Sequence, residues 1–263
     1  WTVRPNGRSA DFIAPGLSHG CAMSCAYCYV ARHRGTANPL AIFTNPEGFA
    51  RAIRRHVDGL PEKAPNQTDP RYWTYDVGES ADLSVDAAIS DNVREIVALF
   101  RELPRAKATF ATKRVEPEML TYDPREKTRI RFSLMPPALA KTLDVRTSPI
   151  EARIRAIYGF RRAGYEVPAN FSPVVVTDTS REDWDELWRM MDDLLEPATK
   201  AALAAEVIFL THSPDLHETN LRWHPKAEEI LWRPEIQEAK INGNGGAAVR
   251  YEHRLKSRMV ASF

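Results

Sequence analysis

Strand-like and helix-like segments alternate along most of this chain of 263 residues, and this alternation restricts the fold more than any other feature of the sequence. The strand-like segments are short and rich in apolar, aromatic or β-branched residues: 11–15, 72–77, 107–112, 129–135, 167–176 and 205–210. Between them lie segments with apolar residues at helical spacing: 46–59, 86–103, 148–163 and 181–195. Strands that alternate with helices form a parallel sheet with right-handed crossovers. We therefore predict an α/β fold of about six β/α units, a partial (β/α)6 barrel of the TIM type, with its functional residues at the C-terminal ends of the strands.

Prolines, glycines and capping residues set the expected boundaries. Pro46 and Pro149 suit the first turns of their helices, Asp86 can cap the helix 86–103, and Gly164 suits the position after the helix 148–163. We expect residues 1–242 to form the barrel. Residues 243–263 then form a C-terminal loop and a short basic segment. The chain starts at Trp1 rather than at methionine, which suggests a trimmed chain with incomplete ends.

Charge and cysteine usage narrow the class of protein. The 36 Lys and Arg against 35 Asp and Glu give a net charge of +1, which excludes a polybasic binder as a global property. No apolar run approaches the roughly 18 residues needed to cross a bilayer, and no signal-peptide pattern opens the chain. The cysteines are Cys21, Cys25 and Cys28, an odd number that does not fit a disulfide framework. We therefore predict a cytoplasmic protein, away from membranes, whose cysteines bind metal.

The cysteine loop has the spacing C-x3-C-x2-C. Three thiolates on one loop can bind three irons of a 4Fe-4S cluster. Since the sequence has no fourth cysteine, the fourth iron is left open for an exogenous chelator. Two alternatives remain: a three-cysteine zinc site completed by His19 or His33, and three incidental thiols. Structural zinc usually uses two distant cysteine pairs, and the sequence has no second pair.

The residues of this loop resemble the cluster motif of radical S-adenosylmethionine (radical SAM) enzymes, in which an aromatic residue precedes the third cysteine, as Tyr27 does here. A closer resemblance, over residues 16–176, is to the spore photoproduct lyase family. The segments that carry it are 20–21, 25–29, 111–113, 129–133, 147–149, 153–154 and 163–165. The resemblance implies the radical SAM fold, a 4Fe-4S cluster, S-adenosylmethionine as cofactor, an electron donor such as flavodoxin or ferredoxin, and DNA with thymine lesions as partner. In that superfamily the cofactor chelates the open iron, and its reductive cleavage gives a 5′-deoxyadenosyl radical.

The resemblance also implies roles for single residues. Cys21, Cys25 and Cys28 match the cluster ligands. Lys113 matches a lysine that holds the carboxylate of S-adenosylmethionine, and Ser133 matches a serine that contacts its ribose. A solvated surface lysine and a serine of a tight turn are the structural alternatives for these two positions.

Further residues complete the implied site. Tyr27 lies on the adenine or ribose side of the cofactor in the family, and Tyr29 matches a catalytic tyrosine of the hydrogen-atom relay. Gly78, Glu79 and Ser80 resemble a glycine–glutamate motif that binds the amino group of the cofactor in many radical SAM enzymes. The alternatives are a structural tyrosine beside the loop for Tyr29 and a helix-capping or surface carboxylate for Glu79.

One position departs from the family. Spore photoproduct lyases of the spore-forming type carry a cysteine after the second strand that returns a hydrogen atom to the thymine radical. An alignment anchored on Asp82 places Glu79 there, and a slip of one residue places Gly78 there. A carboxylate O–H is a much poorer hydrogen-atom donor than a thiol. Either Tyr29 or an external thiol completes the reaction, or the substrate differs.

Basic residues form two clusters that could contact the phosphates of DNA. One follows the cysteine loop and consists of Arg32, Arg34, Arg51, Arg54 and Arg55; the other lies near the C-terminus and consists of Arg250, His253, Arg254, Lys256 and Arg258. In the family resemblance, Arg250 and Tyr251 are candidates for contact with an extruded lesion. A solvated helix face is the alternative for the arginines of segment 46–59.

Three hypotheses for the function follow. The first is a radical SAM enzyme that repairs thymine photoproducts in DNA. The second keeps the radical chemistry but acts on a peptide or a small metabolite, with Glu79 where the lyase has its thiol. The third is a zinc-stabilised nucleic-acid-binding module without catalysis.

Overall fold

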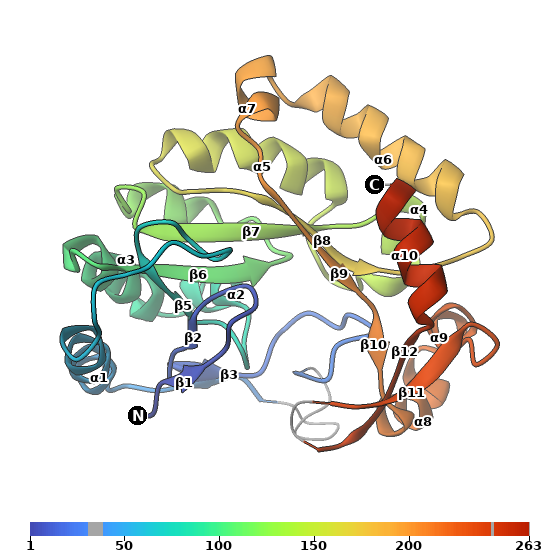
Figure 1. Cartoon of the computed structure of the whole chain (residues 1–263), viewed down its shortest axis with the longest axis horizontal. Coiled ribbons are helices and arrows are strands. Elements are labelled where there is room, and N and C mark those ends of the chain that lie inside the picture. Colours follow the sequence, from blue (N-terminus) through green and yellow to red (C-terminus); the bar gives the residue numbers. More distant parts are fainter. Residues whose placement is uncertain (31–38, 243–244, 263) are drawn as a thin grey trace.

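The computed structural model of the chain describes residues 1–30, 39–242 and 245–262 (Figure 1). Its centre is a seven-stranded sheet in the order β1-β2-β5-β6-β7-β8-β9. These strands are β1 (Arg4–Pro5), β2 (Phe12–Ile13), β5 (Trp73–Asp76), β6 (Ala106–Thr112), β7 (Thr128–Leu134), β8 (Ala169–Val174) and β9 (Ala205–Phe209). All pairs from β2 to β9 are parallel, and only β1 is antiparallel to its neighbour. The sheet curls into a half-barrel, which confirms the predicted α/β fold and partial barrel.

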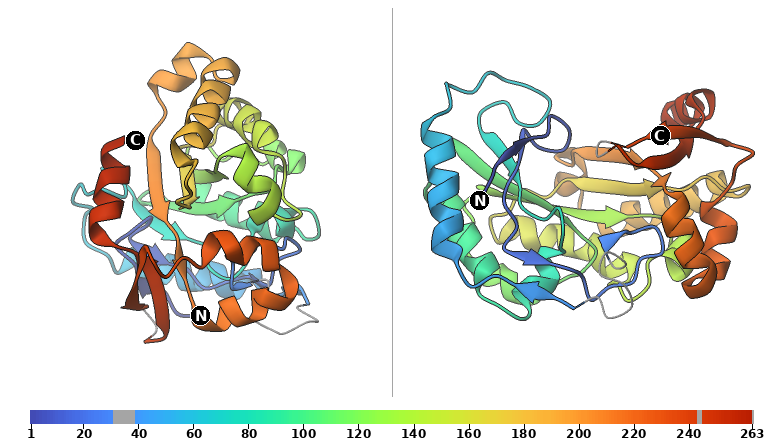
Figure 2. Two further views of the ribbon diagram at one scale, coloured as in Figure 1. Left: turned by 90° about the vertical axis from the view of Figure 1, so that its right-hand side faces the viewer. Right: turned by 90° about the horizontal axis from the view of Figure 1, so that it is seen from below.

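The long helices cover the outer face of this sheet (Figures 1 and 2). They are α1 (Pro46–Asp58), α3 (Asn92–Glu102), α5 (Ile150–Arg162) and α6 (Ser180–Leu194). Strand β7 shows how the two faces differ, since its side chains alternate. The ring of Phe132 packs 5.2 Å from Phe160 of α5, whereas Arg131 and Ser133 point to the concave face. The concave face is therefore partly polar, and the apolar core lies between sheet and helices.

The predicted helix 86–103 is confirmed over α3, but its predicted start and its cap, Asp86, are wrong. The chain instead forms the short helix α2 (Leu83–Ala87), a turn, and then α3. Asp82 caps α2, and its carboxylate accepts hydrogen bonds from the N–H groups of Ser84 and Val85 at 3.0 and 3.3 Å. Asp86 is buried inside α2 and accepts a hydrogen bond from the hydroxyl of Ser18. The apolar spacing continues across both helices, so periodicity alone does not reveal the turn between them.

The other predicted elements are confirmed to within a few residues. Pro46 begins α1, and Gly164 follows α5 with a φ angle of +91°, a conformation that glycine adopts without strain. Several short elements were not predicted: β3 (Ser18–His19), β4 (Ala41–Ile42), the 3-10 helix η2 (Pro117–Thr121), α4 (Pro137–Leu143) and α7 (Pro197–Ala201).

The C-terminal part of the chain forms a small unit beside the end of the sheet (Figure 1). It consists of β10 (Thr211–His212), α8 (Pro214–Trp223), α9 (Pro225–Leu231), β11 (Gln237–Ile241), β12 (Ala247–Tyr251) and α10 (His253–Ser262). Strand β12 lies between β10 and β11. The predicted boundary after residue 242 therefore falls between two strands that pair with each other, and the division into two parts stays a prediction. Within the described residues, no helix has the length and hydrophobicity needed to span a membrane.

Candidate active site

The cysteine loop follows β3 and lies beyond the C-terminal end of β5. After β3, Gly20 forms a parallel bridge with Ala81, and its N–H lies 2.9 Å from the carbonyl oxygen of Ser80. Gly20 has a φ angle of +97°, and a side chain there would meet the carbonyl oxygen of Pro39 at 2.9 Å. Glycine alone fits this close approach, which fixes the point where the cysteines begin.

Backbone hydrogen bonds hold the loop against the end of α4. The N–H of Ser24 donates to the carbonyl oxygen of Val145, and the N–H of Ala26 donates to that of Leu143, both at 2.9 Å. The loop backbone is therefore tied to a second element of the barrel, independently of any metal.

The three thiols are shielded from solvent to different degrees. None forms a disulfide, and Cys25 is buried while Cys21 and Cys28 are partly buried. Burial and the charge of Asp82 raise the pKa of Cys21 to about 12, and burial also raises the pKa of Cys25. A bound metal offsets this cost because it binds the thiolate form directly.

The three thiols do not converge as ligands of a single ion would. A zinc ion would draw three sulfur atoms to about 3.8 Å from one another, because Zn–S bonds are about 2.3 Å long. In the described part of the chain, the group of three ligand atoms close enough to hold one ion is His212, His217 and Glu228, and it includes neither the cysteines nor His19. In a 4Fe-4S cluster each thiolate binds a different iron, so the sulfurs need not converge on one point. His33, the other zinc ligand considered, lies outside the described residues.

Lys113 lies beside Tyr27 of the cysteine loop. Lys113 directly follows β6, and its Nζ lies 5.4 Å from the centre of the Tyr27 ring. The Tyr27 hydroxyl donates to Asp144, and burial beside this carboxylate raises the pKa of Tyr27. Asp144 pairs in turn with Arg153 at 2.8 Å. Because its hydroxyl is held in this way, Tyr27 keeps its ring next to the charge of Lys113, and its contact with a cofactor stays a prediction.

Ser133 lies near the C-terminal end of β7 on the concave face. It is buried, its hydroxyl accepts a hydrogen bond from Nδ2 of Asn170 at 3.1 Å, and its carbonyl oxygen accepts one from Arg153 at 2.7 Å. Oδ1 of Asn170 is buried without a hydrogen-bond partner among the described residues. A ribose hydroxyl would satisfy such an acceptor. Asn170 was not predicted, although an amide within a mostly apolar strand is a signal for it.

Tyr29, Glu79 and Ser80 meet just beyond the end of β5. The hydroxyl of Tyr29, which is 54% exposed, donates to the carbonyl oxygen of Glu79 at 3.3 Å. The carboxylate of Glu79 pairs with Arg4, and Ser80 contributes its carbonyl oxygen to the bridge with Gly20. The structure thus places the position that departs from the family next to Tyr29. Binding of a cofactor amino group by Glu79 stays a prediction, because Arg4 is its partner here.

Comparison with known proteins assigns the chain to a family. A family model described as spore photoproduct lyase matches residues 3–228. The chain belongs to the spore photoproduct lyase family. The spore photoproduct lyase of Clostridium acetobutylicum is 27% identical over 191 residues, which make up 71% of this chain and 53% of that protein. The enzyme of the same name from Bacillus subtilis is 23% identical over 202 residues, 76% of this chain and 55% of that protein. The chain therefore spans about half the length of the curated relatives it matches.

Solved structures of spore photoproduct lyase share the fold of this chain. One is a complex with dinucleoside spore photoproduct, and another is a variant with bound AdoMet and dinucleoside spore photoproduct. Each matches with a TM-score of 0.87 and 17% sequence identity, over 99% of this chain and 74% of the solved chain. The curled parallel half-barrel is therefore the radical SAM fold of the spore photoproduct lyase family.

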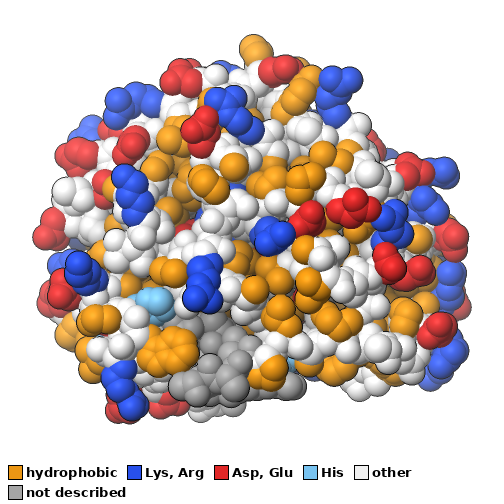
Figure 3. Space-filling model, turned by 180° about the vertical axis from the view of Figure 1, so that it is seen from behind, with side chains coloured by type: hydrophobic (Ala, Val, Ile, Leu, Met, Phe, Trp, Pro, Cys, Tyr) orange, Lys and Arg blue, Asp and Glu red, His pale blue; other side chains and the backbone are white. Residues whose placement is uncertain are grey.

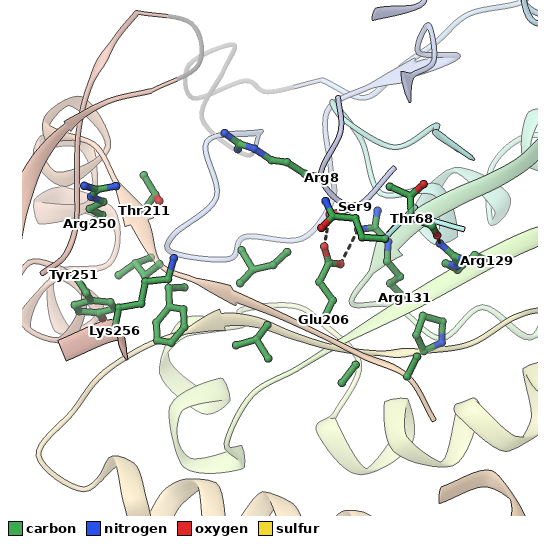
Figure 4. Close-up of a pocket in the computed structure, with 18 of the residues that line it drawn as sticks. Arg8, Ser9, Thr68, Arg129, Arg131, Glu206, Thr211, Arg250, Tyr251 and Lys256 are labelled. Atoms are coloured by element: carbon green, nitrogen blue, oxygen red, sulfur yellow. Dashed lines mark hydrogen bonds and ion pairs between the residues drawn. The ribbon is translucent and has the colours of Figure 1, made fainter. Parts of the chain in front are cut away.

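A cavity of about 820 Å³ lies on the concave face of this spore photoproduct lyase family member (Figure 4). Its lining includes Arg8 and Ser9 of the N-terminal segment, Arg131 of β7 and Glu206 of β9, but none of the cysteines. Arg131 forms ion pairs with Asp76 at 2.8 Å and with Glu206 at 3.0 Å. The charge of Arg131 is thus matched by two carboxylates, which leaves the group with one excess negative charge. The sequence does not predict this group, because its residues lie on three different strands.

The two predicted substrate residues line the same cavity from β12 (Figure 4). The side chain of Arg250 is half exposed and pairs with Glu238 at 2.9 Å. Tyr251 is 2% exposed, and its hydroxyl accepts a hydrogen bond from the N–H of Val176 at 2.9 Å. Tyr251 therefore forms part of the cavity wall, and Arg250 is the more accessible of the two. Contact of either residue with a lesion stays a prediction.

The basic cluster after the cysteine loop is only partly described. Arg51, Arg54 and Arg55 are exposed on α1, where Arg54 pairs with Glu102 at 3.1 Å. Arg32 and Arg34 lie outside the described residues. On the face shown in Figure 3, basic and acidic side chains are interspersed around the rim, and hydrophobic side chains lie across the middle. This face therefore does not present a field of one charge to DNA.

Proposed function

We propose that this chain is a radical SAM enzyme of the spore photoproduct lyase type that acts on thymine photoproducts in DNA. The observation that carries the proposal is the position of the cysteine loop, which lies beyond the C-terminal end of β5 and places its Tyr27 beside Lys113. In parallel barrels this edge of the sheet is where the reaction takes place. The relatives named spore photoproduct lyase, and the solved complex with dinucleoside spore photoproduct, support this choice of substrate.

The residues of the loop and of β6 would hold the reactive groups. Cys21, Cys25 and Cys28 would bind three irons of a 4Fe-4S cluster, as the arrangement of their thiols favours. When bound, the cluster and S-adenosylmethionine supply a 5′-deoxyadenosyl radical through one-electron reductive cleavage. Lys113 offers a compact positive charge for the carboxylate of the cofactor.

Further residues would orient the cofactor. The ring of Tyr27 offers an apolar surface beside Lys113, and the unpaired Oδ1 of Asn170 next to Ser133 suits a ribose hydroxyl. Glu79 already binds one cation, Arg4, so an ammonium group is a suitable competitor for its carboxylate.

Return of a hydrogen atom is the step in which this chain differs from its family. The sequence contains three cysteines, and all of them lie in the loop. The hydrogen atom would therefore come from the hydroxyl of Tyr29, which contacts Glu79, or from an external thiol. The lack of a fourth thiol also supports a second candidate function, which is radical chemistry on a peptide or a small metabolite.

The proposed chemistry also suggests an electron donor and a cellular compartment for the protein. We propose flavodoxin or ferredoxin as the electron donor, because reductive cleavage needs a one-electron reductant of low potential. We propose a cytoplasmic location, because free thiols that bind a cluster require a reducing compartment.

Anaerobic reconstitution tests the proposal. The chain should take up about four irons per molecule, and the reduced protein should convert S-adenosylmethionine into 5′-deoxyadenosine. It should also repair synthetic dinucleoside spore photoproduct when a thiol is added. Cys25→Ala should abolish cofactor cleavage, whereas Thr219→Ala, at a partly exposed position on α8, should not. Binding of one zinc and no iron would overturn the enzyme proposal. Formation of 5′-deoxyadenosine without repair, even with added thiol, would favour the second candidate.

A further inference from the structure

A buried polar network connects the C-terminal helices to the cysteine loop. Its centre is Asn220 of α8, which is fully buried and donates two hydrogen bonds from its side-chain amide. One goes to the carbonyl oxygen of Ala26, which lies between Cys25 and Cys28 and is 194 residues away in the chain. The other goes to Oε1 of Glu228 in α9 at 2.7 Å. The amide thus bridges the loop and a second buried side chain.

Glu228 fixes the orientation of this amide. It is 3% exposed and accepts hydrogen bonds from Nε2 of His212 at 3.1 Å and from Nδ1 of His217 at 2.5 Å. The His217 ring is itself stacked on Trp232 at 4.3 Å. If the Asn220 amide were turned over, its oxygen would face the two acceptor oxygens of Ala26 and Glu228. Only the orientation that donates to both is therefore favourable.

The side chains of His212, His217 and Glu228 are better explained as a hydrogen-bond network than as a metal site. The ligand atoms of His212, His217 and Glu228 lie within 4.8 Å of one another, close enough for one ion. An ion on Nε2 of His212 would place the ring proton on Nδ1, which is buried without a partner in the described part of the chain. Metal-bound histidines nearly always donate that second proton. The hydrogen-bonded form leaves only a lone pair unmatched there, so the geometry favours a hydrogen-bond network.

A second contact lies next to the first. Nε2 of His224, at the junction of α8 and α9, lies 3.2 Å from Oγ of Ser24. The loop also contacts the end of α4, where its backbone N–H groups donate to the carbonyl oxygens of Leu143 and Val145. The loop is therefore held by α4 and by the α8–α9 pair, both far from it in the sequence.

We propose that Asn220 is a positioning residue for the cysteine loop and that Glu228 orients it. In a trans peptide the carbonyl group and the next N–H point in opposite directions. Holding the carbonyl of Ala26 toward α8 therefore points the N–H of Tyr27 away from α8. Hydrogen bonds to the sulfurs of a cluster help to set its reduction potential. Rotation of this peptide would change how tightly the loop retains a cluster and at what potential the cluster is reduced. This inference rests on the proposed function.

The test compares Asn220→Asp, Asn220→Ala and Glu228→Gln with Thr219→Ala in the full chain. Asn220→Asp keeps the size of the side chain but replaces its donor with a carboxylate, which repels the carbonyl of Ala26 and the charge of Glu228. Thr219 is partly exposed, and its hydroxyl donates within α8 to the carbonyl oxygen of Asp215 at 2.9 Å. Thr219→Ala is therefore a control on the same helix that leaves the network intact.

In the reconstituted protein we expect both Asn220 variants to release iron to a chelator about 10-fold faster or more, the effect of removing a group that supports a metal ligand. Their midpoint potentials should shift as well, which general loss of stability would not cause. Glu228→Gln keeps an acceptor for the amide and should have a smaller effect, and Thr219→Ala should match the unmodified chain. Iron release and midpoint potential that are unchanged in Asn220→Asp would overturn the proposal.

Hydrogen exchange of the cluster-free chain separates this inference from the proposed function. The Ala26 amide, which donates to Leu143, should exchange faster in Asn220→Ala than in Thr219→Ala. Equal exchange would overturn the positioning role. A chain that binds no iron at all would overturn the proposed function, and the exchange rates would still decide whether Asn220 holds the loop. Similar far-ultraviolet circular dichroism spectra would confirm that the variants fold.

Discussion

Arg153 of α5 is a buried cation that donates four hydrogen bonds within the candidate site. Its replacement should lower the stability of the fold by a large amount. Its side chain is 1% exposed. Its guanidinium donates to the carbonyl oxygens of Ser148 and Ser133 at 2.8 and 2.7 Å, to Asp144 at 2.8 Å and to the hydroxyl of Thr147 at 2.5 Å. Arg153→Met keeps much of the length and volume of the side chain but removes every donor.

The expected loss of stability follows from these contacts. Asp144, whose side chain is also 1% exposed, would become a buried charge without its cation. Removing one partner of a buried ion pair costs about 3–5 kcal/mol. Two backbone carbonyls lose a donor as well, and each unmatched buried group costs about 1–3 kcal/mol unless water reaches it. We therefore predict that Arg153→Met lowers the free energy of unfolding by at least about 4 kcal/mol, a large part of the roughly 5–15 kcal/mol of a typical domain.

Urea unfolding of the cluster-free chain, followed by circular dichroism, measures this loss. Arg155 supplies a matched control, because it lies on the same helix but its side chain is 60% exposed and, among the described residues, pairs with Glu151 alone. Arg155→Met should cost no more than about 0.5 kcal/mol. Adding Asp144→Asn to Arg153→Met should restore part of the lost stability, since the unpaired charge is then gone. The reasoning is refuted if Arg153→Met lies within about 1 kcal/mol of Arg155→Met, or if the double variant is no more stable than Arg153→Met.

Three further predictions follow from single residues. Burial, with a smaller contribution from Asp82, raises the pKa of Asp86 from 3.8 to about 7. The folded chain therefore binds an extra proton between these values, and stability falls as the pH rises from 4 to 7. At 1.36 kcal/mol per unit, Asp86→Asn should be more stable than the unmodified chain at pH 8 by up to roughly 4 kcal/mol, with little gain at pH 4. A pH-independent difference in urea midpoints would contradict this. Gly164→Ala should destabilise the fold by about 1–2 kcal/mol because of the positive φ angle. Gly159→Ala, inside α5 with open space around it, should instead stabilise the fold by about 0.5–1 kcal/mol. Thermal unfolding of both variants would show whether the two changes in stability have opposite signs. Glu79→Cys should speed repair of dinucleoside spore photoproduct without added thiol, and Glu79→Gln should not; equal rates would mean that this position is not the missing hydrogen donor.

The sequence by itself determined the fold class and predicted the position of the candidate site. Both depend on local signals. The alternation of strand and helix periodicities predicts parallel strands in chain order, because a short crossover returns each strand beside the previous one. The spacing of Cys21, Cys25 and Cys28 within one loop predicts a common metal, because residues so close in sequence stay close in space. Gly164 marked a helix end for the same local reason, since its backbone conformation depends on its own missing side chain.

The tertiary structure decided what supports that site. Asp86 has the sequence features of a helix cap, but in the structure it is buried inside α2 and accepts a hydrogen bond from Ser18. Asp82 caps the helix instead. Asn170 contacts Ser133 from a neighbouring strand, and Asn220 contacts Ala26 across 194 residues of chain. Such contacts leave no periodicity and no spacing in the sequence. They arise only when the packing of the sheet and helices brings separate segments together, because a buried polar group must find its hydrogen-bond partner wherever the fold places one.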